Sequence, residues 1–156
     1  MAKLFDETGD RLTPSHTNRH NRRFRYYISR RLITKGADPT GWRLPAPHLV
    51  AVVLEALRAY LRTRARQHYM LLQPEASTPG ILVKGLNRLS AEAAAEDLWP
   101  IIAEVHITAG SMEVHFDREA LAQSLGLHPE ALNPELMTVQ QQGYSTPRRR
   151  CFARLT

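Results

Sequence analysis

The feature that most restricts the fold is an uninterrupted helical pattern in the middle of the chain. From His48 to about Leu72 there is no proline or glycine. Apolar residues recur along this stretch at the spacing of one helix face; they are Leu49, Val52, Val53, Ala56, Leu57, Tyr60 and Leu61. The opposite side carries Arg58, Arg62 and Arg66 at steps of four, either as a basic stripe or as an ordinary solvated face. The pattern predicts a long amphipathic helix.

The residues before this helix, 1–45, predict an antiparallel β-ribbon. Leu4 and Phe5 are followed by a turn over Asp6–Asp10 that contains Gly9. Farther along, three apolar residues alternate with three polar ones, the period of a strand; they are Phe24, Tyr26 and Ile28 against Arg23, Arg25 and Tyr27. We expect one face of this strand to meet the core and the other to present Arg23 and Arg25 to solvent.

Shorter elements are predicted in the second half of the chain. They are a helix over 81–89, a helix over 91–98 capped by Ser90, a hairpin that turns at Ala109 and Gly110, and a helix over 118–125 between Asp117 and Gly126. The sequence therefore predicts an α+β fold in four segments. These are the ribbon at 1–45, a helical segment at 46–98, a hairpin with its helix at 99–134 and an irregular basic tail at 135–156.

The charge of the chain is strongly segregated. Residues 1–45 carry ten Lys or Arg against four acids, and residues 46–90 carry six against two. Residues 91–147 hold one arginine against nine acids, and the tail adds four arginines, which leaves a net charge of +6. A basic front half suits a phosphate backbone, because each neutralised phosphate releases counterions.

Composition excludes several classes of protein. No apolar run approaches the roughly 20 residues that span a bilayer, and the N-terminus lacks the apolar stretch of a signal peptide. The single cysteine, Cys151, forms neither an internal disulfide nor a thiolate zinc site by itself. We expect a cytoplasmic protein without a membrane partner or a cofactor.

Candidate catalytic and metal sites are incomplete. His16 and His20 lie four apart in a segment that does not predict a helix, and His106 and His115 face each other across the second hairpin without a third ligand. No nucleophile stands in a pattern with a base and an orienting group, and no glycine-rich phosphate loop occurs. We expect no enzyme activity, no bound metal and no small-molecule substrate.

A resemblance to a known family rests on two stretches. The run KLFDETGDRLTPSHTNRHNRRFRYYISRRLI with GWRLPAP, about residues 3–47, resembles the zinc-ribbon region that follows the catalytic domain in serine site-specific recombinases. The stretch VHITAGSMEVHFDREALAQSLG is similar to the last part of the same proteins, and Arg148–Arg150 match a basic C-terminal run. The resemblance implies a module that holds DNA during recombination or integration.

The chain departs from this family in three ways. Its ribbon has no cysteines, so the family's zinc site is not carried over, and the resemblance implies apolar packing by residues such as Phe5 and Tyr27 instead. The resolvase-type domain with its serine nucleophile is missing, which suggests a truncated chain. The ending QQQGYSTPRRRCFARLT fits a core poorly and suggests an altered terminus.

The expected function is therefore binding of duplex DNA without strand cleavage. The main contacts are expected from the ribbon and the secondary ones from the helix; they are Arg22, Arg23, Arg25, Arg30 and Arg31, then Arg58, Arg62 and Arg66. Two alternatives are a protein-interaction module that self-associates through the 46–72 helix and an inert remnant of a mobile element.

Overall fold

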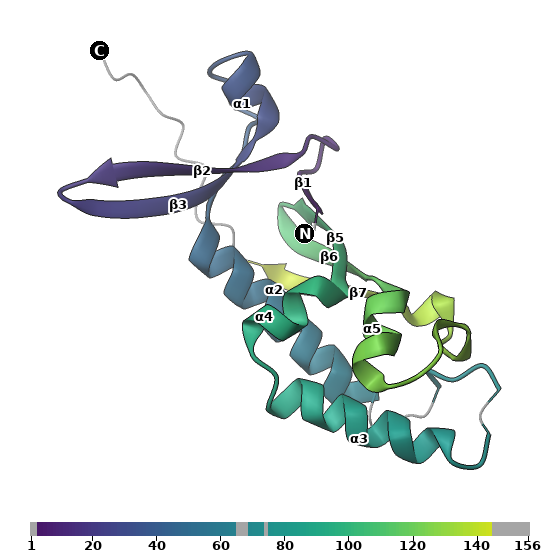
Figure 1. The fold of residues 1–156 in the computed structure, drawn as a ribbon. Helices are drawn as coiled ribbons and strands as arrows, with labels where there is room; N and C mark the ends of the chain where they lie inside the picture. The colour runs from purple at the N-terminus through teal and green to yellow at the C-terminus, as the bar shows by residue number, and fades with distance from the viewer. Residues whose placement is uncertain (1–2, 65–68, 74, 145–156) are drawn as a thin grey trace.

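The chain folds into two β-sheets with helices packed beside them, as the computed structural model shows (Figure 1). The structure describes residues 3–64, 69–73 and 75–144. One sheet has three strands in the order β2-β3-β4, and the other has four in the order β1-β5-β6-β7. The predicted α+β class is confirmed.

The N-terminal ribbon is made by strands β2 (Leu12–Arg19) and β3 (Arg22–Ser29). They pair antiparallel from Leu12↔Ser29 to Arg19↔Arg22 and are joined by a two-residue turn. His20 and Asn21 in that turn both have positive φ, which matches the turns whose twist suits a hairpin. The ribbon projects from the body of the protein, and only its base is flanked by β4 (Arg43–Pro45) and the short helix α1 (Arg30–Thr34) (Figure 1).

Strand β1 (Lys3–Phe5) differs from the predicted arrangement. The predicted turn over Asp6–Asp10 forms, and the Asp6 amide donates a hydrogen bond to the Asp10 carbonyl over 2.9 Å. Beyond it, however, β1 forms a single antiparallel bridge across the turn, Phe5↔Arg11, and it pairs in parallel with β5 through Leu4↔Val105. The hairpin expected around this turn is therefore limited to one bridge, and the main partner of β1 is β5, since pairing across about a hundred residues leaves no trace in a local pattern.

The long helix α2 (Ala46–Arg64) confirms the apolar periodicity of the sequence but not its predicted end. Leu49, Val53, Leu57 and Leu61 are fully buried. The helix does not continue to Leu72, because Met70 and Leu72 exchange backbone hydrogen bonds with residues 131 and 133. This tertiary pairing, together with the bridge Leu71↔Leu132, joins residues 70–72 to residues 131–133.

Helices α3 (Thr78–Ala91) and α4 (Ala95–Leu98) replace the two helices predicted at 81–89 and 91–98. The predicted cap at Ser90 is wrong, because Ser90 lies inside α3, where its hydroxyl donates to the Asn87 carbonyl. Gly85 in the middle of α3 is buried, and a Cβ there would lie 2.7 Å from the Leu125 side chain. The glycine thus permits the close packing of α3 on α5.

The second hairpin and its helix form as predicted. Strands β5 (Ile102–Thr108) and β6 (Gly110–Phe116) pair antiparallel. The Asp117 side chain accepts a hydrogen bond from the Ala120 amide and begins α5 (Arg118–Leu125), and Gly126 with φ of 74° ends it. Short 3-10 turns η1 (Trp99–Ile101), η2 (Pro129–Ala131) and η3 (Pro134–Leu136) flank these elements.

Strand β7 (Thr138–Tyr144) was not predicted from the sequence. Its residues TVQQQGY lie in the segment expected to be irregular, and they pair with β6. One cluster of buried apolar residues extends from Leu4 to Met137 along the sequence and includes residues from all four predicted segments. The four-stranded sheet takes strands from both ends of the described chain, so its contacts cross the boundaries predicted at 45, 98 and 134. No helix among the described residues has both the length and the apolar character to cross a membrane.

Candidate nucleic-acid interface

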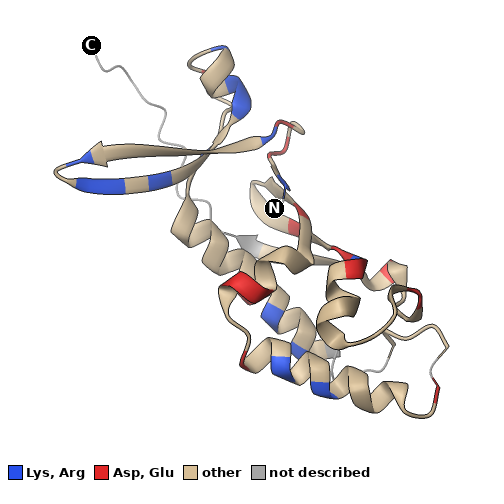
Figure 2. Cartoon of the chain, viewed as in Figure 1, with Lys and Arg blue, Asp and Glu red and all other residues tan. Residues whose placement is uncertain are grey.

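The ribbon carries a concentrated positive charge. Strands β2 and β3 contain no acidic residue, and Arg19, Arg22, Arg23 and Arg25 are all exposed. Figure 2 shows the ribbon with basic segments and no acidic one. None of these four arginines forms an ion pair with any residue in the described ranges. The acidic residues are concentrated instead on the sheet and helices of the second half (Figure 2). The ribbon is therefore a protruding cationic arm.

The two faces of the ribbon differ in composition. Residues paired across an antiparallel ribbon share a face, so the pairs Arg19↔Arg22, Thr17↔Phe24 and Ser15↔Tyr26 form one surface, here called the Phe24 face. The pairs Asn18↔Arg23, His16↔Arg25 and Pro14↔Tyr27 form the other, here called the Tyr27 face.

The face toward the core is the opposite of the one predicted. The Tyr27 face continues into buried Leu12 and Ser29, and Tyr27 packs against the core. On the other side Phe24 keeps 42% of its surface exposed. The expected alternation is present, but Arg23 and Arg25 share the side of the core and reach solvent only because the ribbon extends beyond it.

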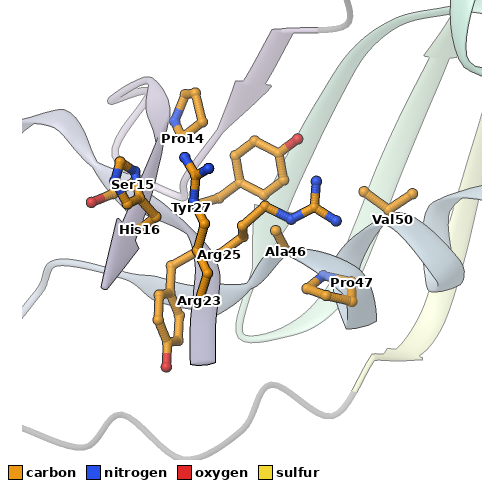
Figure 3. Close-up of a pocket in the computed structure, with 10 residues that line it drawn as sticks. Pro14, Ser15, His16, Arg23, Arg25, Tyr27, Ala46, Pro47 and Val50 are labelled. Atoms are coloured by element: carbon orange, nitrogen blue, oxygen red, sulfur yellow. The ribbon is translucent and has the colours of Figure 1, made fainter. Parts of the chain in front are cut away.

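An open hollow of about 420 Å³ lies between the Tyr27 face and the start of α2 (Figure 3). Arg23, Arg25, His16 and Tyr27 line it from the ribbon, and Ala46, Pro47 and Val50 line it from α2. Burial raises the pKa of the Tyr27 phenol, outweighing the opposite effect of the Arg25 charge. The phenol therefore stays protonated at neutral pH and is able to donate a hydrogen bond beside two guanidinium groups. This combination of donors suits a phosphate group.

Two further basic residues were not singled out by the sequence. Arg19 is drawn into the cationic arm by its pairing with Arg22 across the turn, and the two-residue turn at 20–21 was the signal that could have revealed it. Arg43 from β4 places its guanidinium 4.2 Å from the centroid of the Tyr26 ring. This contact adds a cation to the Phe24 face.

Arg30 and Arg31 were both predicted as DNA contacts, but in the structure the two side chains have different surroundings. Arg30 is exposed at the start of α1. The Arg31 side chain is only 13% exposed and lies among three aspartates. Its Nη1 contacts Asp6 Oδ2 at 2.5 Å and Asp10 Oδ2 at 3.1 Å, and its Nε lies 3.3 Å from Asp38 Oδ2. Arg31 is thus engaged within the protein.

Asp6 is the centre of this network, here called the Arg31 network. Its carboxylate is fully buried and accepts hydrogen bonds from the Ser29 hydroxyl at 2.6 Å and from Thr8 at 2.7 Å. Burial alone would raise the pKa of Asp6, but the hydrogen bonds from Ser29, Thr8 and Arg31 lower it below its ordinary value. The network joins the turn after β1, the end of β3 and the loop before β4, so it fixes the base of the ribbon.

The basic residues of the long helix lie apart from the ribbon. Arg58 donates to the carbonyls of Ser90 and Ala93 at 3.3 and 2.8 Å, and Arg62 pairs with Glu55 at 2.7 Å. At 1.5 Å per residue, Arg58 lies about 18 Å along α2 from its first turn, where the ribbon packs. Arg66 lies outside the described residues. The apolar face of α2 that was predicted to pair with a partner helix is buried within this chain.

The histidine pair of the second hairpin is close, as predicted. The rings of His106 and His115 meet edge to face with centroids 5.3 Å apart, and each ring contacts a glutamate on its own strand, Glu104 and Glu113. Within the part of the chain that the structure describes, no group of three or more His, Cys, Asp or Glu side chains is placed to hold a metal ion.

The zinc site implied by the recombinase resemblance does not fit these residues. The ribbon has no cysteine, and its base is joined by the Arg31 network. Tyr27 packs against the core near that base, whereas Phe5 stacks on His106 at 5.0 Å in the other sheet. A network of ion pairs and hydrogen bonds therefore holds the base of the ribbon.

Comparison with known proteins adds no relative to this description. The chain matches no protein-family model, no curated protein and no solved structure.

Proposed function

We propose that this protein binds duplex DNA through the β2–β3 ribbon. The observation that carries the proposal is a protruding, acid-free ribbon on which Arg19, Arg22, Arg23 and Arg25 are exposed and make no ion pair within the described chain. Four close guanidinium groups without acidic partners repel one another, and a polyanion removes that cost.

The shape of the ribbon favours duplex DNA among polyanions. A two-stranded ribbon is narrow enough to enter a groove of B-DNA, where side chains of one face reach base edges while the strand edges contact phosphates. The hollow beside Arg23, Arg25 and Tyr27 offers a further phosphate contact at the base of the ribbon. Ordering of the ribbon base by the Arg31 network reduces the entropy lost on binding.

A finer proposal is that the chain is a DNA-binding part of a serine site-specific recombinase, with binding and not strand cleavage as its activity. The support is the resemblance of residues 3–47 to the ribbon region of that family, followed by a long helix. A second hairpin with a capped helix then follows in the expected order.

Fluorescence anisotropy of a labelled duplex at several salt concentrations tests the proposal. We expect binding that weakens steeply with salt, and we expect the double variant Arg23→Ala, Arg25→Ala to lower the salt slope by about two units, one for each lost phosphate contact. Arg62→Ala is the matched control, because it also removes a positive charge but lies on α2 beside Glu55.

Two results would contradict the proposal. Absence of wild-type binding at low salt removes the DNA function altogether. An unchanged slope in the double variant, with Arg62→Ala behaving the same way, shows that the ribbon is not the interface. Duplexes of random sequence and of mobile-element ends, titrated side by side, separate a generic basic surface from a recombinase-derived reader.

A further inference from the structure

We infer that Phe24 is a wedge that enters between stacked base pairs and bends the bound duplex. The inference rests on the proposed DNA function and adds a mode of binding to it. It starts from a large apolar side chain in an unusual place, since Phe24 stands on the cationic arm, remote from the core, with 42% of its surface exposed.

The neighbours of Phe24 leave much of its surface exposed. Its partner across the ribbon is the small residue Thr17, and Phe24 makes no ring contact with any other described residue. The other aromatic side chain on the Phe24 face, Tyr26, already lies beneath the Arg43 guanidinium. Among the described residues of this face, Phe24 is thus the one large apolar side chain that is exposed to a ligand.

Cations stand on both sides of this ring. Successive residues on one face of a strand are about 7 Å apart, so the Arg19↔Arg22 pair lies one step toward the tip and the Tyr26–Arg43 contact one step toward the base. Guanidinium groups on either side of an apolar ring match a groove, where phosphates line the edges and base pairs form the floor.

An apolar side chain held in this way has a known use in DNA binding. Proteins that bind the minor groove insert such side chains between base steps, unstack them and kink the duplex by roughly 20–90°. The cost of unstacking is lowest at the flexible pyrimidine–purine steps TA and CA. The ligand predicted for Phe24 is therefore a duplex that contains such a step. The competing arrangement places Phe24 against a thymine methyl group in the major groove, which needs no bend.

Energy transfer between dyes at the two ends of a duplex measures the bend. We expect the wild-type protein to increase energy transfer on a duplex with a central TA step, and to bind it about ten-fold more tightly than a duplex without TA or CA steps. Phe24→Ala is expected to lose both the bend and the preference while it keeps the salt-dependent affinity supplied by the arginines. Phe24→Leu keeps an apolar wedge and should retain most of the bend.

Ile33→Ala is the matched control, because Ile33 is also a large exposed apolar residue, at 57%, but lies on α1 and not on the ribbon. It should bend DNA as the wild-type protein does. 2-Aminopurine placed beside the TA step should brighten on binding of the wild-type protein but not of Phe24→Ala. Circular dichroism of each variant confirms that it is folded before the comparison.

The outcomes separate this inference from the proposed function. If Phe24→Ala bends DNA as well as the wild-type protein does, the wedge is wrong and DNA binding stands. If binding occurs without a bend and weakens when thymine is replaced by uracil, Phe24 contacts a methyl group and the wedge is again wrong. If the wild-type protein binds no duplex at low salt, both proposals fail together.

Discussion

The β2–β3 and β5–β6 hairpins have similar lengths and the same antiparallel pairing, yet different interactions hold them in place. The β5–β6 hairpin lies in the middle of a four-stranded sheet and buries Val105, Ile107, Met112 and Val114 in the core. The β2–β3 ribbon is buried only at its base, where the Arg31 network fixes it.

This difference shows how one motif serves two purposes. A hairpin with one apolar face contributes stability through the area it removes from water. A ribbon anchored by polar contacts at its base contributes little such area, and its remaining surface stays free for a ligand. The arginines of the β2–β3 ribbon and the acidic residues of the β5–β6 hairpin then separate the two ends of the molecule by charge (Figure 2).

The largest effect is expected from Arg31→Ala. The substitution leaves Asp6 buried without its cation, and breaking a buried pair in this way lowers the free energy of unfolding by about 3–5 kcal/mol. Urea denaturation measures the change. Arg23→Ala is the control, because that side chain is exposed and should alter stability by less than about 0.5 kcal/mol. Equal stability of the two variants would show that the ribbon base does not depend on this network.

A somewhat smaller effect is expected from Ile107→Ala in the other hairpin. Ile107 is fully buried, so truncation creates a cavity and lowers the free energy of unfolding by about 2–5 kcal/mol. Phe24→Ala on the ribbon should change it by no more than about 0.5 kcal/mol. Both values come from the same denaturation series, and a large loss in Phe24→Ala would mean that the ribbon packs more tightly than its exposure indicates.

The smallest expected effect is a change in how the free energy of unfolding depends on pH. The pKa of Asp6 is lower in the folded protein than its ordinary value, so the carboxylate adds stability that is present above the ordinary pKa and is lost as pH falls through the folded pKa. In Asp6→Asn one titrating group is removed. The slope of the free energy of unfolding against pH in the acidic range should therefore decrease by up to about 1.4 kcal/mol per pH unit. Asp117→Asn is the comparison outside the network, and an equal flattening there would contradict the role of Asp6.

Some of the fold follows from local sequence. The spacing of Leu49, Val53 and Leu57 predicted the buried face of α2, and Asp117 with Gly126 predicted both ends of α5. These signals act over a few residues, because helix periodicity and capping depend only on neighbouring positions.

The candidate site was predicted in part for the same reason. A run rich in arginine with alternating aromatics revealed the ribbon, but not the polar strand that pairs with it. Residues 12–19 contain Pro14 and mostly polar side chains, so strand propensity is weak there, and β2 forms through its pairing with β3.

By itself, then, the sequence determined the α+β class, the long amphipathic helix and the concentration of positive charge at the N-terminal end. Only the tertiary structure decided that β1 pairs with β5, that β7 completes the sheet, that Arg31 is engaged inside the protein, and that Arg23 and Arg25 share the side of the core. The reason is physical. Periodicity, capping and charge are properties of neighbouring residues, whereas strand partners and ion pairs depend on which distant surfaces meet when the core is buried.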